Sequence, residues 1–425
     1  MIKEIQKRPF VRPLFIWITG ILFYACLPYT LWIPVLLSFI FGVLLLAFVG
    51  RNKNIYPAYD ARWSWGAIFV CSLLILSVLV TAYLDSDIMV EGEWRGEVAN
   101  YMECLKENYL ERLNTLDLSE NERKVLGTIL LGDTKNINKE ILARFSITGV
   151  IHILSVSGFH VAVVCGFLSL LLRPFPSHGL FRWIKYLMIM GLLWGFTLIT
   201  GLAPPSIRAA IMLSLFLTGR ALGRMTDGYN TLAASAFCML VYNPFYLFDI
   251  GFQLSYIAVL FILLLQPLLT RLLTIRNPLL SEPYNWIVIA IAAQTGTAFL
   301  CLYYFNRFPA LFLFTNLPFS FVSTILIPAG LIYILLPSGF PGIDYLAICI
   351  QEMTRFLLYI VDSFSLLPWA SFVLPFDFVD LLLGYGFLLL AVLSVYRKRP
   401  SYLLLSISLL IVLFAKFLLE KAIFL

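Results

Sequence analysis

Two of the chain's three histidines, His152 and His160, stand close together in an otherwise apolar run, with Ser155, Ser157 and Gly158 between them. Polar and ionisable groups at membrane depth are costly, and they usually face a bundle interior or an aqueous path. In a continuous helix the four polar side chains would spread over an arc of about 200°, so the block is predicted to be buried among other helices. We interpret it as a pore- or cavity-lining element, with a broken helix as an alternative to a continuous one. A set of satisfied interhelical hydrogen bonds is the alternative.

The same block is not predicted to carry out catalysis or to bind a metal. Two histidines at this spacing, with no Asp, Glu or Cys ligand nearby, fit no familiar zinc site. Ser157 lies one helical turn before His160, but neither an orienting acid nor an oxyanion hole accompanies the pair. The seven cysteines form no Cys-x-x-Cys motif and are interpreted as packing residues. We therefore expect no enzymatic activity, no metal and no cofactor.

Further polar residues are predicted to face the same bundle interior. Arg208 follows Thr200-Gly-Leu-Ala-Pro-Pro-Ser206, in which the two prolines suit the start of a helix. Its side chain can snorkel to the interface or line a path for an anionic polymer. Asp249 either caps the next helix or joins the polar interior. The remaining candidates are Gln253, Ser255, Gln294 and Asn316, with a helix break predicted at Asn316-Leu-Pro318.

Composition places these residues in a membrane protein. Of the 425 residues, 61% are hydrophobic and 13% are charged, against about 25% charged residues in soluble domains. We predict an all-α polytopic membrane protein with about 11–13 transmembrane or re-entrant helices. The apolar windows are 14–48 as a hairpin, 65–84, 150–172, 183–202, 207–222, 229–242, 250–269, 286–304, 311–336, 343–367, 378–396 and 402–419. No cleavable signal peptide is expected.

Charge placement predicts the orientation of the chain. Basic residues precede the first span and follow the first hairpin, whereas Asp85 to Glu97 is acidic. The positive-inside rule therefore places the N-terminus in the cytoplasm and the acidic segment outside. The basic loops need no nucleic-acid explanation, because orientation alone accounts for them.

Three amphipathic helices are expected between the third span and the histidine block. Residues 101–113 show apolar side chains at every fourth position. Ser119 and Glu122 have capping-box spacing, an apolar stripe (Val125, Leu126, Ile129 and Leu130) follows, and Gly132 can end the helix. A third helix is predicted over 139–145. These extracytoplasmic helices either cover a pore or simply pack on the outer surface.

Four sequence blocks occur in a characteristic order: Leu130-Leu-Gly-Asp133, Gly149 to His160, Pro204-Pro-Ser-Ile-Arg208-Ala and Pro244 to Ser255. Together they resemble the competence domain of the ComEC family, the inner-membrane channel proteins of natural transformation, over roughly residues 118–336. The resemblance implies passage of single-stranded DNA across the bacterial cytoplasmic membrane. It also implies a cytosolic helicase-like motor, an extracytoplasmic DNA receptor and a separate nuclease as partners.

The chain departs from the family pattern in two respects. The stretch 85–100 is too short for the OB-like domain of many members, and the His-x-His-x-Asp-His cluster of a metallo-β-lactamase-like domain is absent. We therefore expect a short member that does not itself hydrolyse DNA. The expected parts are N-terminal transmembrane helices (1–84), a short extracytoplasmic segment (85–117), a ComEC-like competence domain (118–370) and a C-terminal transmembrane hairpin (371–425).

Two other functions stay open. Broken helices and a buried cation also suit a secondary permease for a small or anionic solute, and a non-catalytic membrane scaffold needs no conduit at all. Membrane lipids are expected partners, and a homo-oligomer is compatible with the pattern.

Overall fold

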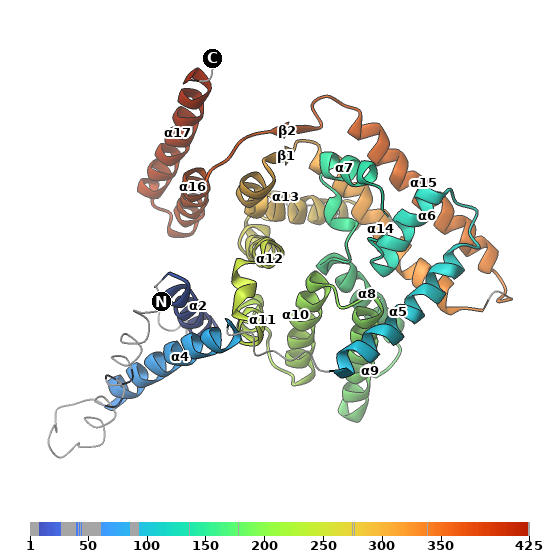
Figure 1. Cartoon of the computed structure of the whole chain (residues 1–425), viewed down its shortest axis with the longest axis horizontal. Helices are drawn as coiled ribbons and strands as arrows, with labels where there is room; N and C mark the ends of the chain where they lie inside the picture. Colours follow the sequence, from blue (N-terminus) through green and yellow to red (C-terminus); the bar gives the residue numbers. More distant parts are fainter. Residues whose placement is uncertain are drawn as a thin grey trace. The chain divides into compact units, whose positions relative to one another are not determined.

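A computed structural model describes residues 8–26, 40, 42, 44, 61–85, 93–135, 137–176, 178–273, 275, 277–337 and 339–423. This part of the chain contains fifteen α-helices and one two-stranded antiparallel ribbon (Figure 1). Seven of its helices are long and apolar enough to cross a membrane. The prediction of an all-α polytopic membrane protein is therefore confirmed. Most of the predicted first hairpin lies outside the described residues.

The elements follow one another along the chain from α2 to α17. They are α2 (Val11–Cys26), α4 (Ala61–Asp85), α5 (Glu93–Leu113), α6 (Glu120–Leu131), α7 (Lys139–Thr148), η1 (Ile151–Ile153), α8 (Gly158–Leu171), α9 (Gly179–Ile199), α10 (Pro204–Ala221), α11 (Gly228–Tyr242), η2 (Pro244–Phe248), α12 (Ile250–Leu269), α13 (Pro278–Phe305), β1 (Arg307–Pro309), α14 (Phe312–Leu335), α15 (Ile343–Ser365), β2 (Ser371–Val373), α16 (Phe378–Arg397) and α17 (Pro400–Ile423). The candidate spans are α9, α12, α14 and α16, together with most of α4, α13 and α17.

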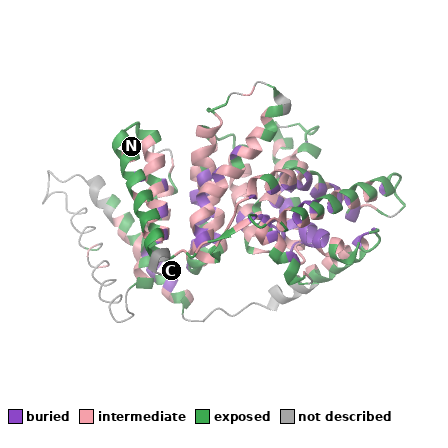
Figure 2. Cartoon of the chain, turned by 90° about the horizontal axis from the view of Figure 1, so that it is seen from above, coloured by how far each residue is buried: buried purple, intermediate pink, exposed green. Residues whose placement is uncertain are grey.

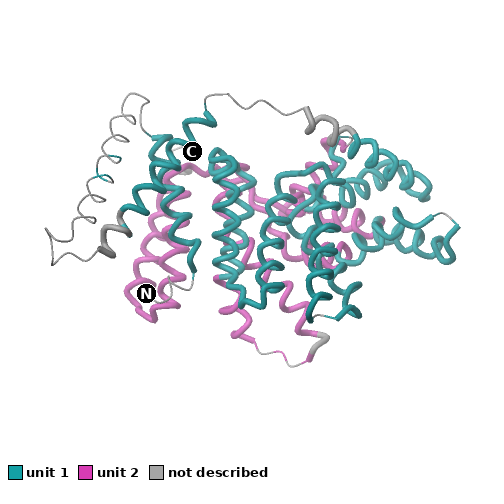
Figure 3. Tube along the Cα trace, turned by 90° about the horizontal axis from the view of Figure 1, so that it is seen from below, with its two compact units in different colours: residues 1–136, 153–263, 324–354 teal, residues 137–152, 264–323, 355–425 magenta. Residues whose placement is uncertain are grey.

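The chain forms two compact units (Figure 3). Unit 1 comprises residues 1–136, 153–263 and 324–354, and unit 2 comprises residues 137–152, 264–323 and 355–425. Buried residues gather where helices pack closely, and most other helix surfaces are intermediate or exposed (Figure 2).

In unit 1, α2 packs against α4 and α11. The Trp17 indole donates a hydrogen bond to the carbonyl of Leu240 at 3.1 Å, and both side chains are buried. Ser77 Oγ donates to the carbonyl of Trp17 at 2.8 Å. A Cβ on Gly20 would lie 2.7 Å from Ser77 Oγ, so only glycine allows α2 and α4 to approach this closely.

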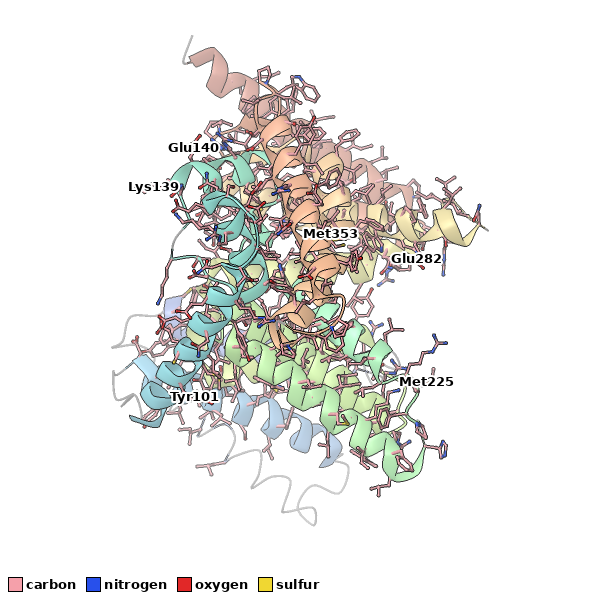
Figure 4. The ribbon with its side chains drawn as sticks, turned by 90° about the vertical axis from the view of Figure 1, so that its right-hand side faces the viewer. Tyr101, Lys139, Glu140, Met225, Glu282 and Met353 are labelled. Carbon is pink, nitrogen blue, oxygen red and sulfur yellow. The ribbon has the colours of Figure 1, made fainter. Side chains whose placement is uncertain are left out.

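The predicted caps of α6 are confirmed. Ser119 and Glu122 form the reciprocal capping box, and Gly132 ends the helix in the left-handed region at φ 69°. The predicted apolar stripe from Val125 to Leu130 is buried. The third predicted helix is also present as α7, which begins at Lys139 and Glu140 (Figure 4).

In unit 2, Gly149 ends α7 and lies against β1. Its φ is +81°, and a Cβ there would lie 2.8 Å from Cβ of Pro309. Because L side chains rarely adopt this φ and the ring leaves no room, glycine is required on both counts.

A charged cluster joins the last two helices of unit 2. Asp377 and Asp380 form a capping box at the start of α16. Lys416 of α17 donates to Asp377 Oδ2 at 2.6 Å and to Asp380 Oδ1 at 2.8 Å. The three side chains therefore fix the pairing of α16 with α17.

Four of the predicted windows are not among the seven helices that are long and apolar enough to cross a membrane. The windows 150–172, 207–222 and 229–242 contain α8, α10 and α11, which are shorter or less apolar than a full span. The window 343–367 forms α15, which is not apolar enough to cross a membrane. Its Ile350 and Leu357 are buried while Tyr345 and Tyr359 are exposed, so α15 is amphipathic. The break predicted at Asn316-Leu-Pro318 does not occur, because α14 continues through it. A proline in a transmembrane helix is tolerated when the freed carbonyl is satisfied elsewhere.

Candidate functional site

The histidine block does not form one continuous helix. The short η1 turn ends at Ile153, residues 154–157 are irregular, and α8 begins only at Gly158. The predicted helical arc of about 200° is therefore wrong, since a spacing of 100° per residue does not apply across the break. The alternative form of that prediction, a broken helix, is the one observed. His152 belongs to unit 2, and Ser155 to His160 belong to unit 1.

Ser157 and His160 fix the start of α8. The Ser157 backbone N–H donates to Nδ1 of His160 at 3.2 Å, and Ser157 Oγ lies 3.0 Å from the same nitrogen. His160 is fully buried. Its imidazole thus occupies the place that Glu or Gln takes in a capping box. Because Nδ1 accepts a hydrogen bond, a neutral ring carries its proton on Nε2.

The irregular segment 154–157 packs between the end of α6 and the α9–α10 turn in unit 1. Ser206 at the start of α10 donates its hydroxyl to the carbonyl of Val156 at 3.0 Å, and both groups are buried. A Cβ on Gly132 would lie 2.9 Å from Val156 Cγ2 and 3.4 Å from the carbonyl oxygen of Thr200. The end of α6, the segment 154–157 and the α9–α10 turn therefore meet at Val156.

Gly158 lies on the side of α8 that meets α10. A Cβ built on Gly158 would lie 3.5 Å from Cβ of Ala209, an ordinary van der Waals distance. The first turns of α8 and α10 are thus in direct contact. Ala209 is the neighbour of Arg208, so this contact helps to set the position of that side chain.

Arg208 is a buried cation with few partners. Its side chain is 4% exposed, and Nη1 lies 3.8 Å from Oδ1 of Asp249. Its Nε is buried without a hydrogen-bond partner among the described residues. A Cβ on Gly251 would lie 3.2 Å from Nη2, so glycine leaves space for the guanidinium against the first turn of α12. The side chain lies inside unit 1 and does not extend to its surface.

The predicted polar residues around α12 mainly fix the η2–α12 turn. Asp249 Oδ1 accepts a hydrogen bond from the N–H of Phe252 at 2.6 Å, which is the capping role predicted as one alternative. Gln253 donates to the carbonyl of Leu247 at 3.0 Å, and Ser255 donates to the carbonyl of Phe252. The side chain of Asp249 is 49% exposed. The carboxylate nearest Arg208 is therefore both hydrogen-bonded elsewhere and partly in solvent, so it neutralises the guanidinium incompletely.

Gln294 and Asn316 lie in unit 2, on α13 and α14 respectively. Both are partly buried. Oδ1 of Asn316 is buried and has no hydrogen-bond partner in the described part of the chain. Their predicted place in a polar interior stays a prediction.

Sequence reasoning missed Ser206 and Gly251 as residues of this site. Ser206 was seen only as part of a helix break, although a hydroxyl beside two prolines at a helix start can reach a neighbouring carbonyl. Gly251 directly follows a capping acid, and that position could have indicated close approach of another group. Within the described residues, no group of His, Cys, Asp and Glu side chains could hold a metal ion.

Similarity to known proteins covers the same region. A family model described as Competence protein matches residues 129–399, more than half of the chain. ComE operon protein 3 of Bacillus subtilis (strain 168) is 27% identical over 205 residues, which cover 48% of this chain and 25% of that protein. An uncharacterized protein of Aquifex aeolicus (strain VF5) is 32% identical over 169 residues, covering 40% of this chain and 38% of the relative. Each match thus spans less than half of the relative's length. No solved structure matches the chain.

Proposed function

Because the chain belongs to the competence protein family, we propose that it passes single-stranded DNA through the bacterial cytoplasmic membrane during natural transformation. It is a multi-pass membrane protein by its seven apolar helices. The proposed orientation places the N-terminus in the cytoplasm. The proposed role is non-catalytic and needs no cofactor.

Arg208 in unit 1 is the observation that supports this role best. A strand carries one phosphate per nucleotide, and charges are expensive in hydrocarbon, so its path has to be wet and cationic. Arg208 is buried, and the carboxylate that pairs with it among the described residues, that of Asp249, lies 3.8 Å away. An arginine keeps its positive charge when it is buried, so Arg208 can attract the phosphates of a strand that passes near it.

The interrupted backbone around Val156 supports the same proposal. Irregular backbone at membrane depth is tolerated only where it is buried in protein or lines a water-filled cavity. Residues 154–157 and the α9–α10 turn meet within unit 1, next to the start of α10 that carries Arg208. In the proposed path, Ser155, Ser157 and His160 shape the wall, while Arg208 supplies positive charge behind it.

Separate partner proteins are proposed to supply the energy for transport, the capture of DNA outside the cell and the degradation of one strand. The sequence contains no Gly-x-x-x-x-Gly-Lys-Ser/Thr motif, so a cytosolic helicase-like motor is proposed to drive transport. An extracytoplasmic DNA receptor and a separate nuclease complete the proposed machinery.

Gene deletion in a transformable host tests this function. Labelled DNA that becomes resistant to external nuclease is measured together with the number of transformants. Deletion should abolish both, the wild-type gene should restore both, and Arg208→Gln should restore less than a tenth. Arg271→Gln, an exposed arginine after α12, is the matched control and should restore uptake fully. Uptake that is unchanged by the deletion contradicts the proposal.

A secondary permease for a small anion is the second candidate. The same buried Arg208 favours it, because a single cation beside a helix start suits one anionic group. Proteoliposomes distinguish the two functions. Accumulation of a defined anionic solute that depends on Arg208 and needs no DNA would favour the permease.

A further inference from the structure

Four basic side chains gather where α9 begins and α10 ends in unit 1. They are Arg182 and Lys185 of α9, Arg220 in the last turn of α10, and Arg224 in the turn that follows. We call this set the basic rim. The two helix ends are adjacent, because the hydroxyls of Tyr186 and Thr218 lie 2.9 Å apart.

Among the described residues, no acid forms an ion pair with the basic rim. The sequence contains neither aspartate nor glutamate between Glu140 and Asp227. Asp227 itself accepts a hydrogen bond from Nε of Arg8 at 3.1 Å and caps α11. None of the four rim side chains forms an ion pair with any described residue. Their charges therefore add up at one end of this helix group.

Arg182 occupies the centre of the rim. Its Nη1 lies 3.8 Å from the place where a Cβ on Gly223 would be, so the side chain crosses from α9 to the α10–α11 turn. Its Nε is buried and has no hydrogen-bond partner in the described part of unit 1. A buried donor of a charged group is costly without an acceptor. An external anion would supply the acceptor that the chain does not.

The surroundings of the rim are apolar and exposed. On the first turns of α9, Leu180 is 73% exposed and Phe181 is 51% exposed. Trp183 is also exposed, and the fully exposed Met225 lies in the α10–α11 turn (Figure 4). Because α9 is a candidate membrane span, these side chains lie at the height where a span leaves the hydrocarbon. Aromatic residues are enriched at that boundary.

We propose that the basic rim binds the headgroup of an anionic phospholipid, with the acyl chains on the exposed apolar side chains of α9. Arg182 and Arg220 contact the phosphodiester, and Lys185 and Arg224 add charge around it. Basic pockets between membrane helices are known to bind such headgroups. The apolar neighbours favour a lipid over a nucleic acid, since a strand would leave Leu180 and Met225 without a partner.

Lipid binding to the purified full chain in uncharged detergent tests the proposal. Native mass spectrometry measures the affinity for phosphatidylglycerol and for phosphatidylcholine with the same acyl chains. The wild-type protein should prefer phosphatidylglycerol at least about tenfold. The triple variant Arg182→Gln, Arg220→Gln, Arg224→Gln should lose about fivefold in affinity for each charge removed and should lose the preference.

Two controls separate binding from folding. The charge-conserving triple Arg182→Lys, Arg220→Lys, Arg224→Lys should keep the preference within about threefold. Arg307→Gln, a basic residue of β1 in unit 2, should not change it.

Three results would overturn the proposal. The first is equal affinity of the wild-type protein for both lipids, or unchanged phosphatidylglycerol affinity in the glutamine triple. The second is binding of sn-glycerol 3-phosphate as tight as that of the lipid, which would indicate a free phosphoester as ligand. The third is a single-stranded oligonucleotide whose binding depends on the three arginines while lipid binding does not.

Discussion

Removing Arg208 and removing the charge of Asp249 should have opposite effects on the stability of unit 1. Arg208→Met replaces the buried cation by an apolar side chain of similar length. Asp249→Asn keeps the side-chain oxygen that accepts the hydrogen bond from Phe252 but removes the negative charge. Because Asp249 neutralises the guanidinium incompletely, Arg208→Met should remove the free-energy cost of burying that charge. Asp249→Asn should leave the buried charge without a carboxylate partner.

The magnitudes follow from the geometry of the pair. At 3.8 Å and an effective dielectric constant of about 20, two unit charges attract each other by roughly 4 kcal/mol. The half-exposed carboxylate lowers this value, and burying an arginine costs several kcal/mol. Arg208→Met should therefore leave the free energy of unfolding unchanged or raise it by up to about 2 kcal/mol. Asp249→Asn should lower it by about 2–3 kcal/mol.

Equilibrium unfolding in mixed micelles, followed by circular dichroism, measures these changes. The double variant Arg208→Met, Asp249→Asn should have a free energy of unfolding within about 1 kcal/mol of that of Arg208→Met. Without the buried guanidinium, the loss of the Asp249 charge leaves no cation unpaired. In the uptake assay, Arg208→Met should fail although it is at least as stable as the wild type. If Arg208→Met costs more than about 2 kcal/mol while Asp249→Asn is silent, the guanidinium is a structural group and the reasoning is wrong.

Three further predictions concern caps and close contacts. Ser119→Ala should lower the free energy of unfolding by about 1 kcal/mol, because it removes the cap of α6; Ser119→Asp, which keeps the acceptor, should not. Gly149→Ala should cost about 2–4 kcal/mol, because φ is +81° and the new Cβ would meet Pro309; a cost below 1 kcal/mol contradicts the geometry. The hydrogen bond from Lys416 lowers the pKa of Asp377 to about 2. The carboxylate should therefore stabilise the α16–α17 pair above about pH 4, and this stabilisation should fade as the pH falls towards 2. Lys416→Met should flatten the stability profile between pH 5 and pH 2, and an unchanged profile would show that the pair does not contribute.

Local signals in the sequence were enough to predict much of this fold. Ser119, Glu122 and Gly132 act within one helix, so their spacing alone specified α6 and both of its ends. A cap was also one of the two roles predicted for Asp249 from its place before an apolar run, and it is the role observed. Composition and the length of the apolar runs were enough to predict a membrane protein. The length that a span needs is set by the thickness of the bilayer and not by neighbouring helices.

Contacts between distant segments could not be predicted in the same way. The irregular segment 154–157 reads as part of an apolar helix, and its conformation depends on the hydrogen bond that Ser206 donates to Val156. The burial of Arg208 depends on Gly251, more than forty residues further along the chain. At Asn316-Leu-Pro318 the local sequence predicted a helix break that is absent, because α14 continues through these residues.

The length of α8 has a consequence for the backbone that precedes it. Its 14 residues rise about 21 Å at 1.5 Å per residue, whereas the hydrocarbon layer is about 30 Å thick. The irregular residues before Gly158 cannot sit in lipid with their peptide groups exposed, so water or protein has to reach them. Within unit 1, protein does so: Val156 is buried, and its carbonyl accepts a hydrogen bond from the hydroxyl of Ser206.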